Sequence, residues 1–98
     1  SINLYKYLIN KKQEFVISKQ LLRSGTSIGA NVKEAIRGQS KPDFLAKMNI
    51  ALKEASETEY WLELLHETDY ITKSDFKNIY ADCQELLKIL MSITKHSK

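Results

Sequence analysis

Three long segments of the chain carry apolar or small residues at alternating spacings of three and four. Such a spacing lays a continuous seam along one face of a helix and is typical of helices that pack against one another. The seams consist of Leu21, Gly25, Ile28, Val32 and Ala35, then of Phe44, Met48, Ala51, Ala55, Thr58, Leu62 and Leu65, and finally of Phe76, Ile79, Cys83, Leu86, Leu90 and Ile93. The pattern predicts an all-α protein.

Sequence signals for the beginnings and ends of helices divide the chain further. The N-terminal residues predict a short first helix over residues 2–10, with an apolar side made of Ile2, Tyr5, Leu8 and Ile9. A polar linker over residues 11–13 separates it from a second helix over residues 15–37, and Gly38 stands at the expected C-cap.

Two capping boxes mark the remaining helices. Ser40 and Asp43 flank Pro42, which suits a first helical turn, and they begin a third helix that ends near residue 68. Thr72 and Asp75 begin the fourth helix in the same way.

The seams also predict which helices face one another. Short connections make neighbouring helices antiparallel, so facing residues have a constant sum of numbers. One register pairs Leu62 with Ile79, and the neighbouring register pairs Ile28 with Ala51. We therefore expect a single domain over residues 1–98, folded as an antiparallel up-down-up-down four-helix bundle.

The third helix carries more apolar surface than one seam requires. Such surface has to be covered, and a second subunit is one way to cover it. The residues concerned predict an oligomer interface formed by Leu45, Leu52, Tyr60, Trp61 and Leu64. The alternative is a longer first helix whose beginning is missing.

Charge is unevenly distributed along the chain. Residues 1–42 carry a net charge of +6, whereas residues 43–98 carry −3. A basic half attracts phosphate backbones, although an ordinary solvated surface has the same composition. The candidate nucleic-acid-binding residues are Lys6, Lys11, Lys12, Lys19, Arg23, Lys33 and Arg37.

A polar stripe runs beside the seam of the second helix. The predicted register brings Arg23 close to Glu57, and Glu34 close to Lys47. The stripe and its partners predict a structural polar network of Arg23, Ser27, Asn31, Glu34, Glu54 and Glu57, and a ligand-binding groove is the alternative. Gly25 and Gly29 lie in the same helix, where they indicate close helix packing; a phosphate-binding loop is disfavoured because no Gly-Lys-Ser/Thr follows.

The sequence holds no recognisable catalytic or metal-binding constellation. Glu63 and His66 have the spacing of a di-iron ligand pair, but a second pair is missing and both are expected to point outward. Cys83 lies on a core seam, where thiols are usually inert. We expect no enzyme activity, no metal and no cofactor. No apolar run is long enough to cross a membrane, and a single cysteine suits a reducing, cytoplasmic location.

Two segments resemble the signatures of a known family. Residues 20–35, which read QLLRSGTSIGANVKEA, and residues 43–62 are similar to the four-helix-bundle proteins encoded by intervening sequences of bacterial 23S ribosomal RNA genes. The matching positions are Arg23, Ser27, Asn31, Glu34, Glu54, Glu57 and Thr58, whereas Ala35 stands where the family often has glycine.

The resemblance implies a ring-shaped homo-oligomer, a homopentamer, with a longer first helix than this chain shows. It also implies a fold similar to the accessory variability proteins of diversity-generating retroelements, which bind nucleic acid and a reverse transcriptase. We therefore expect an oligomeric scaffold associated with RNA, DNA or a nucleic-acid-processing protein. A protein–protein adaptor without nucleic-acid contact is the main alternative, and an enzyme that uses the polar stripe is the other.

Overall fold

The structure, a computed structural model, describes residues 2–12, 14–38 and 40–96, except for the side chains of Lys11, Lys12 and His96. Its elements are α1 (Ile2–Tyr7), a π-helical turn η1 (Leu8–Lys12), α2 (Val16–Arg37), α3 (Lys41–Glu67) and α4 (Lys73–His96). The described residues form helices and connecting turns and no strand. The all-α prediction is confirmed, and three of the four predicted helices have nearly their predicted bounds.

Both predicted caps accept a hydrogen bond from the residue three positions on. The Asp43 N–H donates to Ser40 Oγ at 3.2 Å, and the Asp75 N–H donates to Thr72 Oγ1 at 3.1 Å. Pro42 lies in the first turn of α3, where no intrahelical hydrogen bond is lost. Gly38 is the C-cap of α2 with an ordinary extended backbone, φ −64° and ψ 153°.

The predicted polar linker at residues 11–13 is wrong for its first two residues. Lys11 and Lys12 belong to the π-helical turn, and a hydrogen bond of 3.0 Å from the Glu14 N–H to the Leu8 carbonyl follows it. Gln13 lies outside the described residues. The apolar side of the first helix also differs from the prediction, because Leu4 and Leu8 are buried whereas Ile2 is 56% exposed.

Glu14 supplies the cap of α2, a role that was not predicted from the sequence. Its carboxylate accepts the N–H of Ile17 at 3.1 Å and of Ser18 at 2.7 Å, and the Ser18 hydroxyl donates back to the Glu14 carbonyl at 2.6 Å. Glu14 and Ser18 are both buried. A carboxylate is favourable here because it satisfies free N–H groups at the positive end of the helix dipole.

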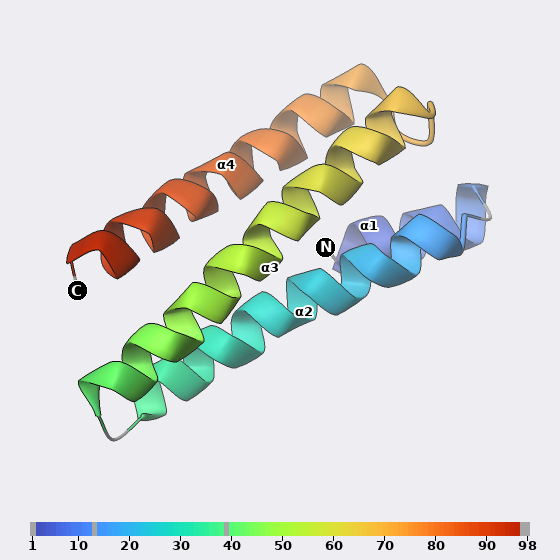
Figure 1. The fold of residues 1–98 in the computed structure, drawn as a ribbon. Coiled ribbons are helices and arrows are strands. Elements are labelled where there is room, and N and C mark those ends of the chain that lie inside the picture. The colour runs from blue at the N-terminus through green and yellow to red at the C-terminus, as the bar shows by residue number, and fades with distance from the viewer. Residues whose placement is uncertain (1, 13, 39, 97–98) are drawn as a thin grey trace.

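The long helices lie side by side in the order α2, α3, α4 (Figure 1), and each runs antiparallel to the next. Helix α3 packs against both neighbours, and α1 folds back onto α2. Leu62 and Ile79 meet in one cluster, and the Cys83 thiol donates to the Ala55 carbonyl at 3.6 Å. The predicted pairing of the seams is therefore confirmed. The molecule is elongated and measures 44 × 20 × 16 Å.

The core consists of two clusters along this row of helices. The first lies at the end that α1 covers and contains Leu4, Leu8, Leu21, Leu62, Leu65, Ile71 and Cys83. The second lies toward the opposite end and contains Ile28, Ala35, Met48, Ala51, Ala55 and Leu90, with no residue of α1. Most members of the two clusters belong to the predicted seams, and each fully buried leucine contributes roughly 1.5–3 kcal/mol.

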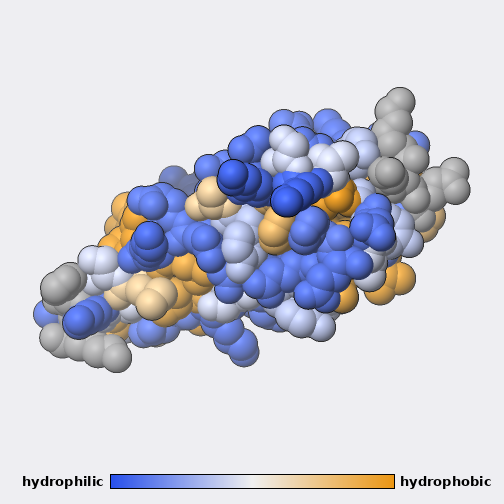
Figure 2. Space-filling model, turned by 90° about the horizontal axis from the view of Figure 1, so that it is seen from above, coloured by the Kyte–Doolittle hydropathy of each residue, from blue (hydrophilic) through white to orange (hydrophobic). Residues whose placement is uncertain are grey.

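Between α2 and α4, a groove of about 290 Å³ runs over α3 and is lined by Gly25, Ile28, Thr58, Leu62, Ile79, Asp82, Cys83 and Leu86. Large apolar side chains also remain exposed, among them Ile36 on α2 (72%) and Ile89 on α4 (48%). Figure 2 shows hydrophobic side chains reaching the surface between hydrophilic ones. In the ranges that the structure describes, no helix combines the length and the apolar character needed to cross a bilayer.

Candidate nucleic-acid interface

The outer face of α2 carries a row of basic side chains. Burial of Leu21, Ser24 and Ile28 fixes how the helix is turned about its axis. The opposite face is then exposed, and its residues at spacings of four and three are Lys19, Arg23, Thr26, Ala30, Lys33 and Arg37. The structure thus brings four of the seven predicted nucleic-acid-binding residues onto one face, which we call the α2 basic row (Lys19, Arg23, Lys33 and Arg37).

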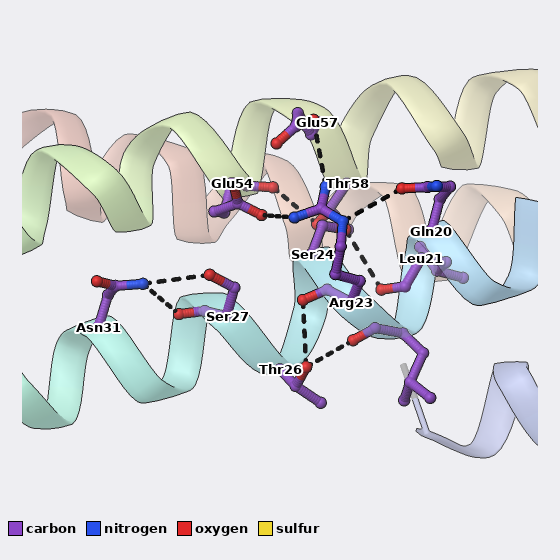
Figure 3. A network of polar contacts seen from close by, with 11 residues as sticks. Gln20, Leu21, Arg23, Ser24, Thr26, Ser27, Asn31, Glu54, Glu57 and Thr58 are labelled. Carbon is purple, nitrogen blue, oxygen red and sulfur yellow. Dashed lines mark hydrogen bonds and ion pairs between the residues drawn. The ribbon is translucent and has the colours of Figure 1, made fainter.

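Arg23 differs from the other members of the row because α3 already holds its guanidinium group. Nη1 lies 3.0 Å from Glu54 Oε2, Nη2 lies 3.3 Å from Glu57 Oε1, and Nε donates to Gln20 Oε1 at 3.2 Å (Figure 3). The carboxylates, chiefly Glu54, raise the pKa of Arg23 above its ordinary value. Arg23 therefore ties α2 to α3, and much of its charge is compensated.

The predicted polar network is not continuous. Arg23, Glu54 and Glu57 form one cluster, whereas Asn31 Nδ2 donates within α2, to the Ser27 carbonyl at 2.9 Å and to Ser27 Oγ at 3.2 Å. Figure 3 shows this pair farther along α2, apart from the arginine. The predicted pair of Glu34 and Lys47 is present at 3.2 Å, at the end of the α2–α3 hairpin.

A buried hydroxyl pair joins the helices beside the arginine. Ser24 Oγ and Thr58 Oγ1 lie 2.8 Å apart, and both residues are buried. The sequence analysis placed Thr58 on the seam of the third helix, but its contact with Ser24 was not predicted. The available signal was that Ser24 lies three residues after Leu21, and therefore next to the seam of α2.

A hollow of about 740 Å³ lies at the hairpin end of the α2 basic row. It is lined by Ala30, Lys33, Glu34, Arg37, Gly38, Ser40, Asp43 and Lys47. Three cationic side chains and two carboxylates share it, and Lys47 is paired with Glu34. Lys33 and Arg37 therefore give the hollow its positive character.

The other three predicted nucleic-acid-binding residues do not belong to the α2 basic row, or their side chains lie outside the described part of the chain. Lys6 is exposed on α1. The side chains of Lys11 and Lys12 lie outside the described part of the chain, and their predicted role stays a prediction.

The predicted oligomer-interface residues are partly used inside the chain. Trp61 packs against the first core cluster, and Leu52 packs against the second. Tyr60 is 56% exposed and meets Trp61 edge to face, with ring centroids 5.0 Å apart. Leu45 and Leu64 are half-buried. The five residues thus supply less free apolar surface than the sequence suggested.

Two other expectations were wrong. Glu63 and His66 do not point away from the protein, because Glu63 accepts the Tyr80 hydroxyl at 2.6 Å and His66 stacks on Phe76. Both residues lie at the edge of the α3 face that packs against α4. The close packing expected at Gly29 is also missing, since a Cβ there would meet no atom within 4 Å outside its own helix.

Within the described residues, no three His, Cys, Asp or Glu side chains are grouped so that they could hold a metal ion. Burial, together with Glu59 and Glu63, raises the pKa of the Cys83 thiol to about 11, which keeps it protonated near neutrality.

The antiparallel hairpins and the Arg23 cluster define an all-α helical-hairpin protein with a basic outer helix. The family described as 23S rRNA-intervening sequence protein matches residues 1–92, and the chain belongs to this family. A crystal structure from Bacteroides thetaiotaomicron, of a protein with unknown function from the S23 ribosomal protein family, is similar with a TM-score of 0.93 and 61% sequence identity. The similarity covers 96% of this chain and 84% of that one. A search of curated proteins finds no match.

Proposed function

We propose that this protein is a non-enzymatic, oligomeric scaffold that binds RNA or another nucleic acid through the α2 basic row. The observation that carries the proposal is the alignment of Lys19, Lys33 and Arg37 on one exposed helix face. Arg23 lies in the same row, and its side chain is 49% exposed beside its carboxylate partners. The name of the family, which refers to ribosomal RNA, supports RNA as the first ligand to test.

The geometry of the row suits a phosphate backbone. Lys19 and Arg37 are 18 residues apart, about 27 Å along a helix, and one nucleic-acid strand presents a phosphate roughly every 3.4 Å in a duplex. Phosphate contacts from lysine and arginine position a protein without reading sequence. The net charge of +6 over residues 1–42, which include α2, favours α2 as a contact for the phosphate backbone.

Self-association would strengthen this binding. The exposed apolar side chains of Ile36 and Ile89 offer surface that a second subunit could cover, and a ring-shaped homopentamer would bring five basic rows together. Such an assembly would act in the cytoplasm, where a lone buried thiol stays reduced. A nucleic-acid-processing protein is the second partner that we propose.

The decisive experiment measures RNA affinity by fluorescence anisotropy at several salt concentrations. The double variant Lys33→Gln/Arg37→Gln should weaken binding and lower the slope of log Kd against log salt concentration by roughly 0.7–0.9 per lost contact. Lys53→Gln removes an exposed lysine from α3 and is the matched control. A wild-type affinity that does not depend on salt would contradict the proposal, and a monomeric mass in native mass spectrometry would remove the ring.

An adaptor that binds only protein is the second candidate. It is favoured by the exposed side chains of Ile36 and Ile89 and, separately, by the groove between α2 and α4. Pull-down with and without nuclease separates the two functions, because a partner bound through nucleic acid is lost when the nucleic acid is digested.

A further inference from the structure

Three rings are stacked in a row where α3 meets α4. The His66 and Phe76 rings have centroids 4.2 Å apart and are nearly parallel, at 10°. The Phe76 and Tyr80 rings follow at 4.8 Å and 28°. Stacking at such distances is favourable beyond the burial of area alone, so the three rings stabilise one another's orientation.

The surrounding side chains hold the row in place. The Tyr80 hydroxyl donates to Glu63 Oε2 at 2.6 Å, and Phe76 packs against the first core cluster. His66 Nδ1 is buried and has no hydrogen-bond partner among the described residues, so stacking and packing set the position of its ring. The row is therefore ordered before any ligand arrives, which lowers the entropic cost of binding.

A cavity of about 320 Å³ opens along these rings. Its lining is almost entirely apolar apart from its rim and consists of His66, Lys73, Phe76, Lys77, Tyr80, Ala81 and Gln84. Lys73, Lys77 and Gln84 are exposed. The cavity thus combines aromatic rings with two ammonium groups and one carboxamide, which can donate and accept hydrogen bonds.

We propose that this cavity binds one nucleotide of a single-stranded nucleic acid. The base lies against the aromatic rings, and Lys73 and Lys77 contact the neighbouring phosphates. Charge complementarity favours this ligand over an apolar peptide, because the two lysines flank the opening while the Glu63 carboxylate is occupied by the Tyr80 hydroxyl. Aromatic side chains with adjacent cations are the usual means of binding single strands without strong sequence preference.

This inference rests on the proposed nucleic-acid function. It adds a second contact, on α4, that binds a base rather than a phosphate. The α2 basic row contacts phosphates only, so it treats an oligonucleotide and its abasic analogue alike. The ring cavity distinguishes them, because an abasic strand has nothing to stack.

The test compares a short single-stranded DNA oligonucleotide with an abasic strand of equal length and charge. The wild-type protein should prefer the strand with bases by at least about five-fold. Ala81→Leu fills the cavity from an exposed helical position and should bring this preference close to one without changing the thermal unfolding curve. Ala46→Leu, the same change at an exposed position of α3, is the control and should keep the preference.

Three other outcomes would contradict the proposed function or the ring cavity. If neither strand binds at low salt, the proposed function fails and this inference fails with it. If both strands bind equally and with salt dependence, the phosphate-binding function stands and the ring cavity is overturned. A loss of preference in Ala46→Leu as large as in Ala81→Leu would also overturn it.

Discussion

Ser24 and Thr58 share a hydrogen bond of 2.8 Å that joins α2 to α3 within the core. Each hydroxyl also lies near a carbonyl of its own helix, Thr58 Oγ1 at 2.9 Å from that of Glu54 and Ser24 Oγ at 3.3 Å from that of Leu21, so either can be the donor of the pair. Ser24→Ala leaves the buried Thr58 hydroxyl without this partner, and we expect the free energy of unfolding to fall by about 1–2 kcal/mol. Urea denaturation followed by circular dichroism measures this loss.

Thr26 provides the control for this prediction. Its hydroxyl is exposed and donates only within its own helix, to the carbonyls of Leu22 and Arg23. Thr26→Ala should change stability by no more than about 0.5 kcal/mol. The double variant Ser24→Ala/Thr58→Val should lose less than the sum of its single variants, and simple additivity would contradict a direct interaction.

The bond between Tyr80 and Glu63 predicts a stability change in alkaline solution. This hydrogen bond, aided by burial and by the charge of Glu59, raises the pKa of Tyr80 to about 12 from an ordinary value of 10.0. A group with a raised folded-state pKa stabilises the fold below its unfolded pKa and loses that contribution as the pH rises from 10 to 12. Thermal unfolding across this interval should show a decline that Tyr80→Phe reduces.

Tyr60→Phe is the matched control for the alkaline experiment, because Tyr60 is 56% exposed on the neighbouring helix. It should leave the decline unchanged. A difference titration of tyrosinate absorbance between the wild type and Tyr80→Phe should show ionisation near pH 12. Ionisation near pH 10 would contradict the hydrogen bond.

Cys83 should react slowly while the protein is folded. Burial first, and then Glu59 and Glu63, raises the pKa of its thiol to about 11 from 9.0, so at pH 8 the folded protein has roughly 100-fold less thiolate than the unfolded chain. Alkylation at pH 8 should therefore be slow and should accelerate when urea unfolds the protein. A Ser74→Cys/Cys83→Ser variant moves the thiol to an exposed position and should react rapidly without urea. Fast alkylation of native Cys83 would contradict its burial.

Glu14 should be important for the start of α2. Glu14→Ala removes the acceptor for the N–H groups of Ile17 and Ser18, and we expect a loss of about 1–2 kcal/mol in chemical denaturation. Glu85→Ala changes an exposed glutamate of α4 and should stay within about 0.5 kcal/mol. Equal effects of the two variants would show that the cap contributes little.

The sequence was sufficient for the helices and their pairing, because the seams repeat over many turns and must be buried together. Leu62 meets Ile79, and Ser40 and Thr72 cap the helices that they were predicted to cap. The π-helical turn was missed because it is defined by backbone hydrogen bonds between residues five apart, which no periodicity of side chains in so short a segment encodes.

The polar side chains were harder to place than the apolar ones. Glu63 and His66 lie at the border of a helix face, where a small rotation decides between solvent and a neighbouring helix. Ser27 and Asn31 are four residues apart on one helix, so they can satisfy each other instead of reaching α3. Arg23 was placed correctly because its partners, Glu54 and Glu57, lie on the facing helix at the predicted register.

The row-like order of the helices has a consequence for local opening. Helix α4 packs against α3 alone for most of its length, whereas α3 packs against α2 on one side and α4 on the other. Protection from solvent is greatest where neighbours must separate on both flanks at once. The amide hydrogens of α4 should therefore exchange through local detachment of that helix. Those of α3 should exchange only when the whole domain unfolds.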